Sequence, residues 1–381
     1  PAAGRHLRDI TALKDSYLTA GIKLERLLRL LGRNSVEWRF RNVARIAFLL
    51  QSGAWSSFFS WFEAARYGRA IGRAPVPTDP VFIIGHWRTG TTLLHQLMAL
   101  DPALSAPTLF QVAVPDSFLV SYPYYRPLFK RVVSERRPMD EVRIGMDEPQ
   151  EDEYAIYRLT SYSPLERLVF PDSGSYFLNH GRDFLPRGEE LNRWKAGVGR
   201  YYKKLAFKTG KRIVSKNPFN SFRIGTLREI FPSAKFIYMV RHPYDVVPST
   251  IHMWRILQEQ NTLGRLSPPP ETGEVTGLYR LLDETVGRDT AELPTGDITK
   301  VRYEDLVRSP GETLKETYHA IGLPFDERMP ELIRRFTENN ASYRKNSFSL
   351  SARDQELIAA GLESLMTREG YAPDMPTTPG S

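Results

Sequence analysis

The stretch that most constrains the fold is residues 81–100, VFIIGHWRTGTTLLHQLMAL. Residues 81–84 are apolar and rich in β-branched and aromatic side chains, which is typical of a strand buried on both faces of a parallel sheet. A loop bounded by Gly85 and Gly90 follows, and from Thr91 onward leucines recur at helical spacing. A strand, a tight loop and a helix in this order point backbone N–H groups and the positive end of a helix dipole at one place. The stretch therefore predicts an anion-binding site in an α/β fold.

The loop departs from a nucleotide-binding P-loop in one informative way. The spacing of Gly85 and Gly90 is that of a P-loop, but the Lys and Ser or Thr that should follow are replaced by Thr91 and Thr92. A kinase needs that lysine on the β- and γ-phosphates of ATP. Here the cation lies inside the loop at Arg88, whose planar fork suits a phosphate or sulfate oxyanion. We expect the loop to bind a phosphate-like group without a metal ion.

This loop resembles the 5′-phosphosulfate loop of sulfotransferases. These enzymes move a sulfuryl group from 3′-phosphoadenosine 5′-phosphosulfate (PAPS) to an acceptor and release adenosine 3′,5′-bisphosphate. The resemblance assigns the whole loop and the first helical residues to the donor nucleotide. The residues so assigned are Gly85, His86, Trp87, Arg88, Thr89, Gly90, Thr91 and Thr92.

A second site follows the strand predicted at residues 235–240. Arg241 stands at the end of this strand, and Ser249 lies eight residues later, which is about two helical turns. An arginine and a serine on one strand-to-helix corner can together hold a phosphate away from the first loop. The pattern is similar to the 3′-phosphate site of sulfotransferases. The two loops then address the two ends of one nucleotide.

Three further segments resemble the large, mostly bacterial group of sulfotransferases that is related to enzymes acting on lipids and small alcohols. They are KNP at 216–218, VRYEDL at 301–306 and RKNSFSL at 344–350. The resemblance implies that Arg344 and Lys345 contact the nucleotide and that Lys216 neutralises the leaving phosphate. For Lys216, an ordinary surface lysine is the alternative.

The residue that accepts the proton of the acceptor hydroxyl is less evident, because no clear equivalent of the catalytic histidine of cytosolic animal sulfotransferases appears. His95 lies one turn into the predicted helix and is one candidate, with a structural helix histidine as the alternative. An acidic cluster is the preferred source, because resemblance to the tyrosylprotein branch and to several bacterial members implies a carboxylate base. Glu151 and Glu153 lead, followed by Asp152, although such residues also favour a helix N-terminus.

Composition narrows the class of protein. The chain has 381 residues, 41% of them hydrophobic, which is enough for a large core. Its net charge of +8 favours an acidic ligand such as a nucleotide, an anionic membrane or nucleic acid. The absence of cysteine excludes disulfides and fits a cytoplasmic location, and the seven histidines show no metal-binding spacing. We expect no metal ion and no nucleic-acid partner, and the sequence predicts no oligomeric state.

The periodicity along the chain predicts a P-loop-like three-layer α/β/α fold with a central parallel sheet and added N-terminal and C-terminal helices. We divide it into an N-terminal helical extension (1–74), a sulfotransferase catalytic domain (80–350) and a C-terminal helix with a flexible tail (351–381). Besides the first strand, the predicted strands are 211–215, 235–240 and 298–303. The predicted helices include 6–32, 36–66, 191–208, 219–231 and 304–321.

Two segments have competing interpretations. Residues 55–73 combine an aromatic cluster with three arginines, which fits either a helix packed on the sheet or peripheral contact with a membrane. Residues 258–276 have the length of a mobile lid, with plain disorder as the alternative. Residues 106–129 are rich in aromatic side chains and suit an apolar or aromatic acceptor.

We expect the acceptor to be a small-molecule or lipid alcohol or phenol. Two other functions remain open at this stage. One is a P-loop-type kinase of a small molecule or lipid, against which the missing lysine argues. The other is a non-catalytic basic protein that binds membranes or nucleic acid, but its basic residues should form a stripe, whereas many here alternate with acids.

Overall fold

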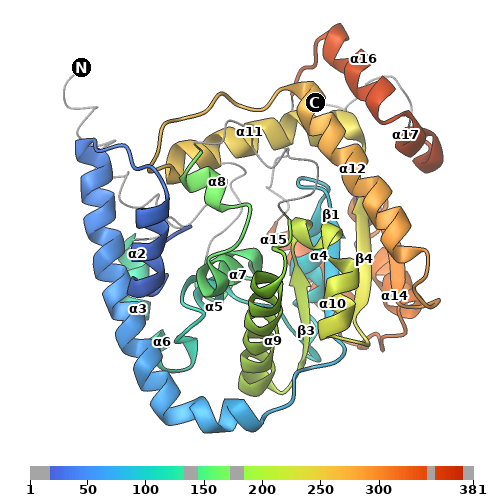
Figure 1. The fold of residues 1–381 in the computed structure, drawn as a ribbon. Coiled ribbons are helices and arrows are strands. Elements are labelled where there is room, and N and C mark those ends of the chain that lie inside the picture. Colours follow the sequence, from blue (N-terminus) through green and yellow to red (C-terminus); the bar gives the residue numbers. More distant parts are fainter. Residues whose placement is uncertain (1–17, 133–144, 172–183, 341–347, 372–381) are drawn as a thin grey trace.

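The chain folds around a five-stranded, fully parallel sheet of order β2-β3-β1-β4-β5 (Figure 1). The structure is a computed structural model and describes residues 18–132, 145–171, 184–340 and 348–371. The chain runs from β1 to the β2 edge, returns through β3, and then crosses β1 to β4. The switch point therefore lies between β1 and β4, and parallel α/β sheets bind their ligands beyond the carboxyl ends of such strands. The strands are β1 (Val81–Gly85), β2 (Leu104–Ser105), β3 (Arg212–Lys216), β4 (Lys235–Val240) and β5 (Ile298–Arg302).

Alternate residues of the strands face two different helical layers. Phe82 and Ile84 of β1 pack in one core with side chains of α9, α10 and α12. Val81 and Ile83 pack in a second core with α4, α14 and α15. This arrangement confirms the predicted three-layer α/β/α fold. The helices of the two layers are α9 (Glu189–Thr209), α10 (Ile224–Ile230), α12 (Thr272–Thr290), α4 (Thr91–Met98), α14 (Pro310–Ala320) and α15 (Met329–Asn339).

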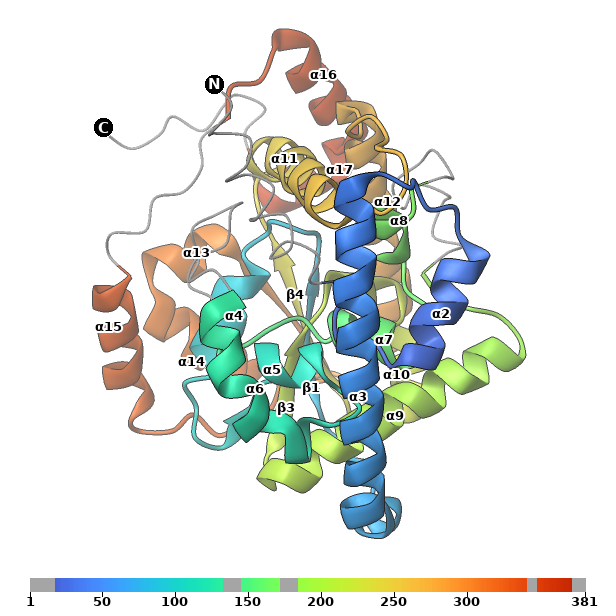
Figure 2. The same ribbon diagram turned by 90° about the vertical axis from the view of Figure 1, so that its left-hand side faces the viewer.

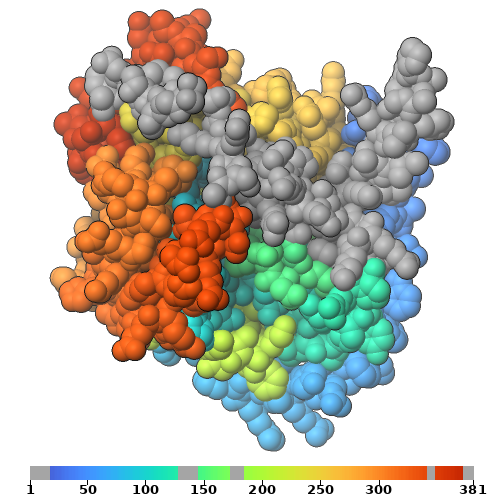
Figure 3. All heavy atoms as spheres, turned by 180° about the vertical axis from the view of Figure 1, so that it is seen from behind, coloured from blue at the N-terminus to red at the C-terminus, as the bar shows by residue number. Residues whose placement is uncertain are grey.

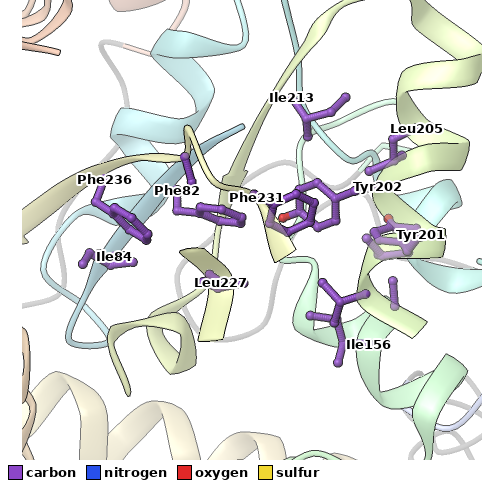
Figure 4. Packing of buried hydrophobic residues seen from close by; sticks show 14 of the residues in the cluster. Phe82, Ile84, Ile156, Tyr201, Tyr202, Leu205, Ile213, Leu227, Phe231 and Phe236 are labelled. Atoms are coloured by element: carbon purple, nitrogen blue, oxygen red, sulfur yellow. The ribbon is translucent and has the colours of Figure 1, made fainter. Parts of the chain in front are cut away.

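Aromatic rings form the centre of the first core, as Figure 4 shows. The ring of Phe82 lies 5.6 Å from that of Tyr202 on α9. It also lies 5.7 Å from the rings of Phe231 and Phe236. Because large rings bury much apolar area, this row ties α9 and the end of α10 to the middle of the sheet.

The N-terminal helices cover one side of the molecule. The long helix α3 runs along this side in Figure 2, and the N-terminal elements, in blue, form a margin of the surface in Figure 3. Leu27 and Leu49 share a third core with Trp254 of α11 and Leu263. The C-terminal helices pack in a fourth core against α11 and α12. These elements are α2 (Leu24–Arg33), α3 (Phe40–Arg73), α8 (Glu166–Val169), α11 (Pro243–Asn261), α16 (Ala352–Gly361) and α17 (Glu363–Glu369).

Several predicted elements differ in extent. The predicted helix 219–231 is two elements, because Arg223 leaves the helical conformation with φ −129°. The predicted helix 304–321 is interrupted at Ser309, just before a proline. Strand β2 was missed, since it has only two residues and no apolar run. The divided elements are η1 (Pro218–Phe222), α10, α13 (Tyr303–Arg308) and α14.

The proposed lid at 258–276 is wrong in its extent. Helix α11 continues to Asn261, and α12 already begins at Thr272. The first connecting residues are buried, because Leu263 enters the third core and its N–H donates to the carbonyl oxygen of Val169 at 2.8 Å. The start of this connection, residues 262–264, is therefore part of the scaffold.

The aromatic-rich segment 106–129 contains short helices. Helix α6 tolerates two internal prolines, Pro123 and Pro127. The predicted helix at 6–32 is seen only as α2, and residues before 18 lie outside the described part of the chain. Of the helices in the described ranges, none combines the length and apolar content needed to cross a bilayer. The remaining helices are α5 (Leu109–Ala113), α6 (Phe118–Val132) and α7 (Glu153–Thr160).

Candidate active site

The loop at residues 85–90 joins β1 to α4 through conformations that its glycines allow. Gly85 and Gly90 have φ angles of 139° and 93°, which residues with a side chain rarely adopt. A Cβ on Gly90 would lie 2.2 Å from Cδ2 of Tyr303, and one on Gly85 would lie 2.5 Å from the carbonyl oxygen of Met239. Neither position accommodates a larger residue, so the loop is fixed tightly against its neighbours.

Three side chains of this loop stabilise the loop itself. Thr89 is buried and donates from Oγ1 to the carbonyl oxygen of His86 at 2.7 Å. The His86 ring stacks on Tyr279 with centroids 4.6 Å apart, and complete burial lowers the pKa of His86 to about 4. Trp87 is buried in the third core. Arg88, which is half-buried, is then the side chain of the loop best placed to reach a ligand. The N–H groups of Gly85 and Thr89 are bonded within the protein, to Oγ of Ser221 and to the carbonyl oxygen of His86.

Thr91 and Thr92 begin helix α4 at the point where the loop ends. Thr91 is buried and Thr92 is half-buried. The first N–H groups of a helix have no partner within the helix, and the helix dipole is positive there. Together with the other N–H groups of the loop, this end of α4 can hold a phosphate or sulfate group.

The second loop meets the first at the switch point. Arg241 directly follows β4 and donates from Nη1 to the carbonyl oxygen of Arg88 at 3.0 Å. Its Nη2 lies 2.9 Å from Oδ2 of Asp245, and its guanidinium stacks over the ring of Tyr303 at 4.2 Å. Arg88 in turn donates from Nε to Oγ of Ser249 on α11 at 2.9 Å. The structure thus brings Arg88, Arg241 and Ser249 into one connected group.

Lys216 and Glu151 form an ion pair beside the first loop. Lys216 ends β3 and is in register with Ile83 of the adjacent strand β1, so it lies at the carboxyl edge of the sheet. Its Nζ donates to Oε1 of Glu151. The Glu151 side chain keeps 15% of its surface exposed, whereas Lys216 keeps 2%. A partly accessible carboxylate and a cation therefore lie next to each other at the edge where ligands bind.

The other two carboxylates of the acidic turn, residues 151–153, are fully buried. Asp152 accepts hydrogen bonds from the hydroxyl of Tyr202 and from Nδ2 of Asn217, the latter at 2.7 Å. Burial raises the pKa of Asp152 to about 6. Glu153 pairs with Arg223, whose Nη2 lies 3.0 Å from Oε1, and it also accepts from Asn217 at 2.7 Å. Both side chains are committed to neighbours, which disfavours Asp152 and Glu153 as a base for an external hydroxyl.

His95 is also buried. It lies on the face of α4 that packs against β3, and its Nε2 is 3.2 Å from the carbonyl oxygen of Val214. A proton acceptor for a bound alcohol must reach that alcohol directly or through one water. The burial of His95 therefore favours the structural interpretation that the sequence left open.

Some site residues were missed or cannot be placed. Arg344 and Lys345 lie outside the described residues. Tyr303 was not singled out, although it belongs to the VRYEDL segment and contacts both loops. Asn217, which holds Asp152 and Glu153 together, belongs to the KNP segment. Both residues lie in segments that the sequence analysis had singled out. Their contacts depend on the tertiary structure and could not be read from those segments.

Within the described ranges, no group of three or more His, Cys, Asp or Glu side chains is arranged to hold a metal ion. The side chains that could hold the phosphates of a nucleotide are Arg88, Arg241, Ser249 and Lys216, with the N-terminus of α4.

The fold and these loops define a P-loop-like α/β protein. Two solved structures share the fold: sulfotransferase STF9 from Mycobacterium avium, with a TM-score of 0.60 and 17% identity over 85% of each chain, and sulfotransferase STF1 from Mycobacterium tuberculosis, with a TM-score of 0.57 and 16% identity over 91% of this chain and 93% of that one. The model of the sulfotransferase family matches residues 80–327. The chain belongs to the sulfotransferase family, as the sequence motifs predicted.

Three proteins of similar sequence are also named as sulfotransferases. The omega-hydroxy-beta-dihydromenaquinone-9 sulfotransferase Stf3 of Mycobacterium bovis is 33% identical over 93% of this chain and 91% of its own length. The protein of the same name in Mycobacterium tuberculosis matches equally well. A putative protein-tyrosine sulfotransferase of Caenorhabditis elegans is 27% identical over 42% of this chain and 62% of its own length.

Proposed function

We propose that this sulfotransferase uses PAPS as its donor and transfers the sulfuryl group to a hydroxyl of a lipid or small-molecule acceptor, with Glu151 as the general base. The observation that carries this proposal is the connected group of Arg88, Arg241 and Ser249 at the switch point. It gives one binding edge with two cationic anchors, which suits a nucleotide with phosphates at both ends.

The donor phosphosulfate is assigned to the first loop. The N–H groups at the start of α4 and the side chains of Arg88, Thr91 and Thr92 would neutralise it without a metal ion. The 3′-phosphate is assigned to Arg241 and Ser249. Arg241 is preorganised for this role, because Tyr303 and Asp245 hold its guanidinium in place.

The acceptor is activated by the ion pair beside the loop. As the acceptor oxygen attacks sulfur, its proton passes to Glu151, the bond between sulfur and the phosphate oxygen breaks, and adenosine 3′,5′-bisphosphate leaves. Protonation of Glu151 cancels the charge that Lys216 neutralises in the resting pair. The cation of Lys216 is then available to the phosphate that gains charge, which is the role the sequence assigned to it.

The acceptor class follows from the relative whose name describes its substrate. That relative acts on an omega-hydroxylated menaquinone, which is an isoprenoid lipid with a terminal hydroxyl. We propose a related amphiphilic alcohol for this chain. The aromatic-rich segment 106–129, in which the rings of Phe110 and Tyr122 meet edge to face with centroids 5.0 Å apart, suits an apolar acceptor. The cytoplasmic location expected from the sequence stays a prediction.

The test is transfer of radiolabelled sulfuryl from PAPS to an omega-hydroxylated isoprenoid quinone. Glu151→Gln keeps the size and hydrogen-bonding capacity of the side chain but removes its basicity. We expect a loss of about 10²–10⁴-fold in kcat, the range for a general base, with affinity for adenosine 3′,5′-bisphosphate unchanged.

His95→Asn is the matched variant, because it removes the rival base. It should keep most of the turnover once its folding is verified by nucleotide binding. If Glu151→Gln turns over normally while His95→Asn binds nucleotide but is inactive, Glu151 is not the base and His95 is.

A further inference from the structure

Helix α3 differs from an ordinary surface helix because its outward face is apolar, while its inward face buries polar residues beside apolar ones such as Leu49. At 3.6 residues per turn, the face that packs on the protein carries several polar residues, and the opposite face is apolar. The buried polar residues of the inner face are Asn42, Arg45, Ser56 and Glu63.

The inner face is fixed by specific partners. Arg45 donates to the carbonyl oxygens of Thr262 and Gln260 at 3.1 and 2.8 Å. Near the other end of the helix, Glu63 forms a buried ion pair with Lys204 of α9 and accepts from the backbone N–H of Leu119 at 2.8 Å. Because an unpaired buried charge is costly, rotating α3 to bury its apolar face instead would be strongly unfavourable. The outward orientation of that face is therefore enforced.

The outer face is apolar and aromatic over most of its length. Five of its rings are exposed: Phe40 by 92%, Trp55 by 52%, Phe58 by 53%, Trp61 by 69% and Phe62 by 45%. Between Arg45 and Glu63 the sequence has no charged residue. A contiguous exposed patch of this kind marks an interaction site. We call it the aromatic face, formed by Phe40, Val43, Ala47, Gln51, Ala54, Trp55, Phe58, Trp61, Phe62 and Ala65.

Both ends of the aromatic face are basic. Arg39 and Arg41 are exposed at its start, and Arg66, Arg69 and Arg73 are exposed at its end. No acidic residue lies on the helix except the buried Glu63. An apolar centre with cationic flanks matches the surface of an anionic bilayer, where aromatic rings enter the interface and arginines contact headgroups.

A second copy of the chain fits this surface less well. Both ends of the face carry arginines, so two such helices packed side by side would bring like charges together in either orientation. An anionic lipid surface has no such conflict.

We propose that the aromatic face of α3 docks on an anionic membrane surface, with α3 lying in the plane of the interface. This goes beyond the proposed function and does not depend on the identity of the acceptor. The proposal decides between the two interpretations of residues 55–73. Phe59 is buried and belongs to the scaffold, whereas Trp55, Phe58, Trp61 and Phe62 face the lipid.

Co-sedimentation with lipid vesicles tests the docking directly. The whole chain should bind vesicles of phosphatidylcholine mixed with phosphatidylglycerol, and high salt should weaken the binding. The double variant Trp61→Ser with Phe62→Ser should lose about tenfold or more in vesicle affinity, because two rings no longer enter the interface. The double variant Arg66→Gln with Arg69→Gln should lose roughly tenfold or more on anionic vesicles and little on phosphatidylcholine alone.

Helix α16, which lies far from α3 in Figure 1, supplies the matched controls. Leu357→Ser removes an exposed apolar side chain there, and Arg353→Gln removes an exposed arginine. Both controls should bind vesicles like the original chain. All variants should bind adenosine 3′,5′-bisphosphate equally, which separates loss of docking from loss of folding or of the donor site.

Two results would overturn the proposal. One is absence of vesicle binding, or an equal loss in the α16 controls. The other is a change of oligomeric state in the Trp61 and Phe62 variant without any change in vesicle binding, which would assign the aromatic face to a second copy of the chain.

Discussion

The donor edge and the acidic turn encode their chemistry in different ways. At the proposed donor edge, residues 85–92 with Arg241 and Ser249, the proposed binding of a nucleotide rests on backbone shape and on motif spacing along single strand–helix units. In the acidic turn, three adjacent carboxylates with similar chemistry acquire three different environments from residues far away in the sequence. The comparison teaches that motif spacing can suggest an anion site, whereas the choice among candidate bases depends on tertiary partners.

The acidic turn offers the sharpest test of this comparison, because the same substitution, Glu to Gln, can be made at two neighbouring positions. Glu153→Gln removes the charge that faces Arg223, and both side chains of this pair are fully buried. The lone buried charge should reduce the free energy of unfolding by about 3–5 kcal/mol, measured by urea denaturation. Glu151→Gln, whose carboxylate is partly exposed, should lose less stability but more turnover.

The contradictory pattern would be a Glu153→Gln variant that keeps its stability and loses turnover while still binding nucleotide. Glu153 would then act on the acceptor, and the division between a structural and a chemical carboxylate would be wrong.

A smaller effect is expected at the donor edge. Arg241→Ala should weaken nucleotide affinity by about 1.5–3 kcal/mol, the range for a hydrogen bond to a charged group. The loss should be larger for PAPS than for adenosine 5′-phosphosulfate, which lacks the 3′-phosphate. Calorimetric titration of both ligands measures the difference, and an equal loss would show that Arg241 does not read the 3′-phosphate.

The sequence predicted the sheet well because the strands depend on local signals, whereas the assignment of residues 85–92 to a donor nucleotide stays a prediction. The apolar runs at 81–84 and 235–240 mark strands that are buried on both faces, and their β1 and β4 positions agree with the prediction. Gly90 could be recognised as part of the loop, but the reason that only glycine fits there is the ring of Tyr303. That contact joins residues more than two hundred positions apart and has no local signature.

The sequence could not decide between Glu151 and Glu153 as the proposed base for the same reason. Glu151, Asp152 and Glu153 look alike as neighbours before a helix, and their difference comes from Lys216, Tyr202 and Arg223. Helix α3 shows a similar limit of prediction from sequence. Periodicity predicts the helix, but it does not predict which face is turned outward, because both faces contain aromatic residues.

The central claim is that the two loops hold one nucleotide that carries a phosphate at each end. Isothermal titration of the chain with adenosine 3′,5′-bisphosphate in the presence of a chelator tests it most directly. We predict binding of one molecule per chain without a metal ion, and much weaker binding of ATP with or without magnesium. Absence of binding, or binding that appears only with magnesium, would contradict the account.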